Sequence, residues 1–190
     1  TGTSYSWSTG ATTASITVST TSSPTVTVTD GNGCSATSTA ASVTVNALPT
    51  ATISAGGPTT FCQGGSVTLT ATGAASYLWN TGDFTSSITV NAAGSYFVVG
   101  TSAAGCETTS ATTVVTTSTI PAVAAITGAN NVCEGGSINL TSSTINGTWT
   151  SANNFIATVS NTGIVTGLNA GTTTISYTVT NGACATAVTA

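Results

Sequence analysis

The stretch Phe61–Thr70, FCQGGSVTLT, sets the pattern of the whole chain, because it joins a cysteine, a glycine turn and a strand. In its second half, valine and leucine alternate with serine and threonine, and such period-two alternation is typical of a strand with one buried face. The stretch recurs as Val132–Thr141, VCEGGSINLT. We therefore expect a repetitive, all-β protein that is essentially free of helix.

Two further landmarks give the length of the repeat. Trp7 and Trp79 are 72 positions apart, and so are Cys34 and Cys106. Prolines after the last valine-rich strand of a repeat, at Leu48-Pro49 and Ile120-Pro121, mark its boundaries. The predicted modules are residues 1–48 (the C-terminal half of one module), 49–119 and 120–190. Because the proline-bearing joints are short, the modules are expected to stand end to end in a semi-rigid rod.

Each complete module is predicted to contain about seven short strands, which is typical of an antiparallel Ig-like β-sandwich. In the middle module, Trp79 falls on the third strand, where such sandwiches keep a core tryptophan, and Tyr96 falls where a tyrosine corner would lie. A short fourth strand is expected near Phe84. Trp7 and Trp149 occupy the position of Trp79 in their own modules, so all three tryptophans are predicted to pack in cores and not to form a sugar-stacking platform.

The composition removes most chemical functions. The chain has no Lys, Arg or His, and its only charged side chains are four carboxylates. Nucleic-acid binding needs cations to neutralise phosphate, and no credible pair of nucleophile and base is present. Asp83 and Glu107 lie on separate predicted turns, which argues against a glycosidase carboxylate pair. We expect no enzyme, no catalytic or metal site, no cofactor and no nucleic-acid partner.

Five cysteines in a chain without histidine favour disulfides over zinc, and therefore an oxidising, extracellular setting. No apolar stretch is long enough to cross a bilayer. The chain begins with Thr, as expected of a mature fragment or of a window from a longer protein.

The pairing of the cysteines is open between two alternatives. The familiar one lies within modules and joins Cys62 to Cys106 and Cys133 to Cys184. Against it, Cys62 precedes the second strand whereas Cys106 follows the sixth, so the two would lie at opposite ends of a sandwich. A strand of about seven residues spans roughly 23 Å, far beyond the reach of a disulfide. The other alternative joins Cys62 to Cys184 across the joint and sends Cys106 to a cysteine upstream of this sequence. In either case the partner of Cys34 lies outside the sequence.

The third module carries the segments Gly147–Ser151, Ala157–Ser160, Gly163–Gly167 and Gly171–Ile175, which together resemble group 2 bacterial Ig-like domains. The first two modules resemble the cysteine-containing Ig-like and PKD-like repeats of giant Bacteroidota surface adhesins of the type IX secretion kind. The resemblance implies a long extracellular or surface-anchored filament used in attachment, gliding or capture.

We therefore expect a structural or adhesive repeat segment of a cell-surface filament, stiffened by disulfides. Because almost no charge separates neighbouring chains, lateral bundling is expected, with other copies of the chain and an unknown surface ligand as partners. Two alternatives stay open. One is a carbohydrate-binding module array, for which Phe84 and Phe155 are the candidate exposed aromatics. The other is an Ig-like decoration or fibre segment of a phage.

Overall fold

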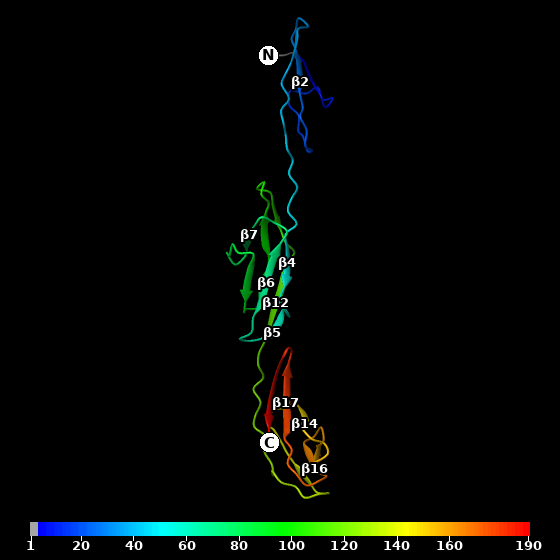
Figure 1. Cartoon of the computed structure of the whole chain (residues 1–190), viewed down its shortest axis with the longest axis vertical. Coiled ribbons are helices and arrows are strands. Elements are labelled where there is room, and N and C mark those ends of the chain that lie inside the picture. The colour runs from blue at the N-terminus through cyan, green and yellow to red at the C-terminus, as the bar shows by residue number, and fades with distance from the viewer. Residues whose placement is uncertain (1–3) are drawn as a thin grey trace.

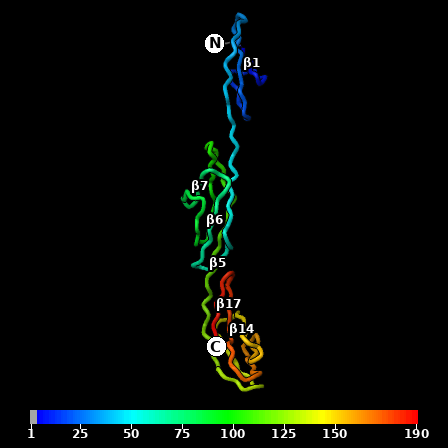
Figure 2. The backbone as a smooth tube through the Cα atoms, in the orientation of Figure 1, coloured from blue at the N-terminus to red at the C-terminus, as the bar shows by residue number. Residues whose placement is uncertain are grey.

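The computed structural model describes residues 4–190, which form a long, narrow molecule without helix. Three groups of β-strands follow one another along its length (Figure 1), and single extended segments of the chain connect these groups (Figure 2). We call residues 4–48, 49–119 and 120–190 the N-terminal, middle and C-terminal modules. The predicted all-β class is confirmed. Within residues 4–190 no helix is long and apolar enough to cross a membrane.

The middle module is a sandwich of two layers. One layer is the antiparallel sheet β4-β6-β8. The other consists of the sheets β11-β10-β7 and β5-β12-β9, which continue into each other because β9 and β10 are separated by Phe97 alone. The strands are β4 (Thr52–Ala55), β5 (Thr60–Cys62), β6 (Val67–Thr72), β7 (Ser76–Trp79), β8 (Ser87–Val90), β9 (Gly94–Tyr96), β10 (Val98–Thr101), β11 (Glu107–Thr109) and β12 (Thr113–Ser118).

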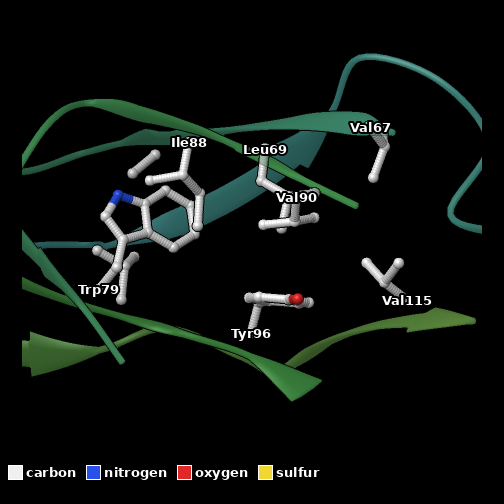
Figure 3. Close-up of a cluster of buried hydrophobic side chains, with 9 residues drawn as sticks. Val67, Leu69, Trp79, Ile88, Val90, Tyr96 and Val115 are labelled. Atoms are coloured by element: carbon white, nitrogen blue, oxygen red, sulfur yellow. The ribbon is translucent and has the colours of Figure 1, made fainter. Parts of the chain in front are cut away.

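The core of the middle module follows from the alternation along β6. Val67, Leu69 and Ala71 are buried between the layers, whereas Thr68 is exposed on the outer face. From the opposite layer, Trp79 and other side chains pack against them (Figure 3). The complete buried cluster is Val67, Leu69, Ala71, Trp79, Ile88, Val90, Tyr96, Val98 and Val115.

The short strand expected near Phe84 is absent, and that prediction was wrong. The chain turns back directly after β7, where the Trp79 backbone N–H donates to the Asp83 carbonyl oxygen at 2.8 Å. Gly82 takes a positive φ of 93° within this turn. A residue in that conformation ends strand pairing, so the following segment runs as a loop until β8.

The C-terminal module also has two layers, with sheet orders β13-β16-β15 and β14-β17-β18. Leu140, Ala157, Val165 and Ile175 form its buried cluster. The strands are β13 (Ser137–Asn139), β14 (Thr148–Ser151), β15 (Ala157–Val159), β16 (Ile164–Gly167), β17 (Ile175–Asn181) and β18 (Cys184–Thr189).

The N-terminal module contains one three-stranded sheet, of order β1-β2-β3. Its strands are β1 (Ser4–Trp7), β2 (Val26–Thr29) and β3 (Ser35–Thr37), and none of their positions is fully buried. A backbone bridge between Ser22 and Val43 extends the pairing beyond the named strands. The module is thus a single sheet with no second layer among its described residues.

Candidate functional site: the joint between the middle and C-terminal modules

A disulfide joins Cys62 of the middle module to Cys184 of the C-terminal module. Their Cα atoms are 5.4 Å apart although the residues are separated by 122 positions in the chain. Cys184 is only 1% exposed, so the bond is shielded from solvent on that side. We refer to this bond, with the linker residues Ser118 and Thr119 beside it, as the stapled joint.

Strand pairing brings Cys62 to the place where the chain leaves the middle module. β5 runs parallel to the end of β12, with Cys62 opposite Ser118. The next backbone N–H, that of Gln63, donates to the Ser118 carbonyl oxygen at 2.9 Å. Because this short strand is anchored to the last residue of β12, Cys62 lies at the very end of the sandwich and faces the following module.

The second cysteine arrives on a hairpin. β17 and β18 form an antiparallel pair in which Asn181 lies opposite Cys184, so Cys184 stands at the tip. The Cys184 sulfur lies 3.4 Å from the carbonyl oxygen of Ser118. Both cysteines therefore meet at the same point of the linker.

Polar contacts hold the hairpin tip to the linker beside the disulfide. The Asn181 side-chain amide donates to the backbone oxygen of Thr119 at 3.2 Å and to its hydroxyl at 2.8 Å. Gly182 has a positive φ of 56°, and a Cβ there would lie 2.5 Å from the Ser118 hydroxyl oxygen. The tip thus packs closely against the linker, and its positive φ favours glycine at position 182.

The three remaining cysteines, Cys34, Cys106 and Cys133, are free in the structure. The within-module pairs Cys62–Cys106 and Cys133–Cys184 are therefore not formed. Cys106 lies in the corresponding hairpin turn of the middle module, with its sulfur 4.0 Å from the Asn46 carbonyl oxygen. It faces the previous joint in the way that Cys184 faces this one.

The aromatic residues singled out in the sequence take different positions. Trp79 is 1% exposed, and its indole N–H donates to the Thr85 carbonyl oxygen. Trp7 makes the same bond to Thr13, but is only half-buried in its single-layered module. Trp149 is half-buried against Tyr177, with ring centroids 4.6 Å apart.

Tyr96 is buried and is the last residue of β9. Its hydroxyl donates to the Ala92 carbonyl oxygen four residues earlier, at 3.0 Å. This bond has the form of a tyrosine corner, in which the hydroxyl returns to the backbone a few residues upstream.

The surface offers little that resembles a ligand site. Phe84 and Phe155 are 76% and 74% exposed. A cavity of about 320 Å³ opens in the C-terminal module between Val132, Ile138, Ile175 and their neighbours, and no aromatic side chain lines it. Among the described residues no three His, Cys, Asp or Glu side chains gather into a group that could hold a metal ion.

Two of the carboxylates bind their own turns. Asp30 accepts hydrogen bonds from the backbone N–H groups of Asn32 and Cys34, and Asp83 accepts one from the Thr81 hydroxyl.

Asn181 and the linker residues Ser118 and Thr119 were not anticipated from the sequence. The Asn-Gly pair at 181–182 is a strong hairpin signal and could have pointed to the tip.

Comparison with known proteins bears on the C-terminal part of the chain. The family described as bacterial Ig-like domain (group 2) matches residues 111–190. No curated protein matches the sequence. Among solved structures, the crystal structure of murine CEACAM1b aligns with 73% of this chain and 96% of its own, at 14% identity and a TM-score of 0.40. The middle and C-terminal modules are two-layered, Ig-like β-sandwiches, and residues 111–190 are similar to group 2 bacterial Ig-like domains.

Proposed function

We propose that this chain is a structural segment of a long extracellular filament, in which Ig-like modules stand end to end and disulfides across the joints make the array stiff. The observation that carries the proposal is the Cys62–Cys184 bond, because it links two modules instead of stabilising one. A disulfide inside a module would strengthen that module but leave the joint free to bend. A bond across the joint connects the two modules covalently a second time, beside the linker.

The chemistry of the surface supports this role over catalysis or recognition of charged ligands. The chain has no basic side chain and a formal net charge of −4. Disulfides persist in oxidising environments such as the exterior of a cell, which supports an extracellular location. The similarity of residues 111–190 to bacterial Ig-like domains supports a bacterial surface protein.

The proposal extends to the use of the filament. We infer attachment, gliding or capture by a surface adhesin of the type IX secretion kind, with other copies of the chain as lateral partners. Only 2% of the residues are charged, so neighbouring rods repel one another weakly and can bundle side by side. A surface ligand would bind to parts of the filament beyond the joints described above.

Small-angle X-ray scattering tests the stiffening role. The reference variant carries Cys34→Ser, Cys106→Ser and Cys133→Ser, so that the staple is its only disulfide. The second variant carries Cys62→Ser and Cys184→Ser in addition. We expect the reference to give one narrow distribution of interatomic distances with a long maximum, and the second to add shorter, bent conformers. Identical scattering from the two would overturn the proposal, because the staple would then not control the shape.

A further inference from the structure

We propose that Cys133 is a covalent docking site for the cysteine-bearing hairpin tip of another module of this kind. The proposal rests on the end-to-end array proposed above and adds to it the residue through which the C-terminal module receives its next neighbour. Three observations support it: the turn that holds Cys133, its position in the module, and the partly apolar cavity beside it.

The turn around Cys133 repeats the turn around the bonded Cys62. In the middle module the Gly65 N–H donates to the Cys62 carbonyl oxygen at 2.9 Å, and in the C-terminal module the Gly136 N–H donates to that of Cys133 at the same distance. The glycine between them has a positive φ in both turns, 88° at Gly64 and 74° at Gly135. Because the turn is of the same kind, Cys133 takes the position in its module's sequence that Cys62 takes in the middle module, although Cys62 lies on β5 and Cys133 on no strand.

Cys133 lies at the end of the C-terminal module opposite the stapled joint. Its neighbours Val132 and Glu134 line the same cavity as Ile175 and Ala190. Ile175 and Ala190 are the open ends of the β17–β18 pair, whose other end is the tip at Cys184. β17 has seven residues, so the two ends of the module are about 20 Å apart. Cys133 is exposed there, whereas Cys184 is buried in the stapled joint.

The cavity gives the docking site an apolar floor. It has a volume of about 320 Å³, and Ile138, Val165 and Ile175 contribute to its lining. A hairpin tip built from small residues can enter such a space and bury apolar surface as it does so. Glu134 adds one negative charge at the rim, which disfavours tips that carry a carboxylate of their own.

A second copy of the chain carries a suitable probe tip. Cys34 is exposed in the turn between β2 and β3, at the start of the rod. Bond formation needs an oxidant, for which glutathione disulfide serves. The Cys34 thiolate first attacks glutathione disulfide, breaks its S–S bond, keeps one glutathione in a mixed disulfide and releases the other as a thiol. The Cys133 thiolate then attacks the Cys34 sulfur, forms the Cys133–Cys34 bond and releases a second glutathione thiol.

The test uses three variants of the full chain, each with one free cysteine besides the staple. The receiver carries Cys34→Ser and Cys106→Ser and keeps Cys133. The donor carries Cys106→Ser and Cys133→Ser and keeps Cys34. The matched control donor carries Cys34→Ser and Cys133→Ser and keeps Cys106, which faces the joint to the N-terminal module. Receiver and donor are mixed in equal amounts in a glutathione redox buffer, and the disulfide-linked dimers are counted by intact mass.

Random pairing makes receiver–donor dimers half of the total. We expect them to exceed the two homodimers together by at least tenfold, and the control donor to show no such excess. Replacing Asp30 by Asn in the donor should raise the excess further, because it removes a negative charge from the tip that the proposal brings to Glu134. A random distribution, or equal coupling of the control donor, would overturn the inference. Peptide mapping of the same samples for the Cys62–Cys184 bond shows separately whether the stapled joint is intact, so either proposal can fail alone.

Discussion

The side-chain amide of Asn181 donates to both the backbone oxygen and the hydroxyl of Thr119, which lies 62 positions earlier in the chain. These two bonds hold the hairpin tip to the linker beside the disulfide. The joint is therefore fixed at two places, once by sulfur and once by an amide. We expect these amide contacts to hold the tip beside Cys62 in the reduced chain as well, and so to govern how readily the disulfide forms.

Replacing Asn181 by Ala should weaken the disulfide without breaking it. Each of the two hydrogen bonds contributes about 0.5–1.5 kcal/mol, so we expect the effective concentration of Cys62 for Cys184 to fall roughly five- to hundredfold. The measurement is the equilibrium of the disulfide in glutathione buffers of known composition. Asn32→Ala, at a hairpin tip of the N-terminal module, is the matched control and should leave the equilibrium unchanged. An equal equilibrium in both variants would show that the amide contacts do not orient the tip.

The staple should also change how the chain extends under force. When the two ends are pulled, tension passes from Cys62 through sulfur to Cys184, and the residues between them bear none. With a separation of 122 residues, roughly 400 Å of extended chain stays hidden. Single-molecule pulling should recover that length after reduction, or in the Cys62→Ser, Cys184→Ser variant. The variant that lacks Cys34, Cys106 and Cys133 should behave as the unreduced chain does; a contour length unaffected by reduction would contradict the prediction.

Gly100 tests the packing between the layers of the middle module. A Cβ at this buried position would lie 2.7 Å from the Cβ of Ala74 and 2.8 Å from that of Ala51. Gly100→Ala should therefore lower the free energy of unfolding by about 1–3 kcal/mol through overpacking. Gly57→Ala, where an added Cβ meets nothing within 4 Å, should change it by less than about 0.5 kcal/mol. Calorimetric unfolding of the two variants measures the difference, and equal midpoints would refute this account of the packing.

The hydroxyl groups of Tyr177 and Tyr96 should differ in importance. Tyr177 accepts a bond from the Gly147 N–H at 2.8 Å and donates one to the Thr144 carbonyl oxygen at 2.7 Å. Tyr96 makes the single bond to Ala92. Tyr177→Phe should therefore destabilise the C-terminal module by about 1–3 kcal/mol, and Tyr96→Phe the middle module by about 0.5–1.5 kcal/mol. Chemical denaturation of each variant gives both values; a larger loss at Tyr96 would count against this reasoning.

Much of the fold could be predicted because one rule, the alternation of side chains along a strand, determines it. Val67, Leu69 and Ala71 alternate with threonines in the sequence and are buried in the structure. β5 escaped prediction, since three residues are too few to show alternation and its partner β12 lies 56 positions away. The prediction of a strand near Phe84 was wrong because of a local effect. The turn at Gly82 overrides the strand preference of the neighbouring residues.

The stapled joint could be predicted only in part. Strand length and the order of strands favoured a bond across the joint, but left the pairing within modules open as well. The structure contains the bond between Cys62 and Cys184. The contacts of Asn181 with Thr119 depend on the register of the β17–β18 hairpin and on the path of the linker. Neither the register of the hairpin nor the path of the linker can be predicted from the local sequence pattern.

The Cys62–Cys184 bond also makes the rod tolerant of damage. It closes the chain into a ring that includes most of two modules, so a single cut in the backbone anywhere between these residues opens the ring without separating its ends. A protease that nicks an exposed loop, such as the one that carries Phe84, leaves the filament in one piece. The two ends of the ring separate only when the disulfide is broken as well as the backbone, so cuts between Cys62 and Cys184 can accumulate while the rod stays continuous.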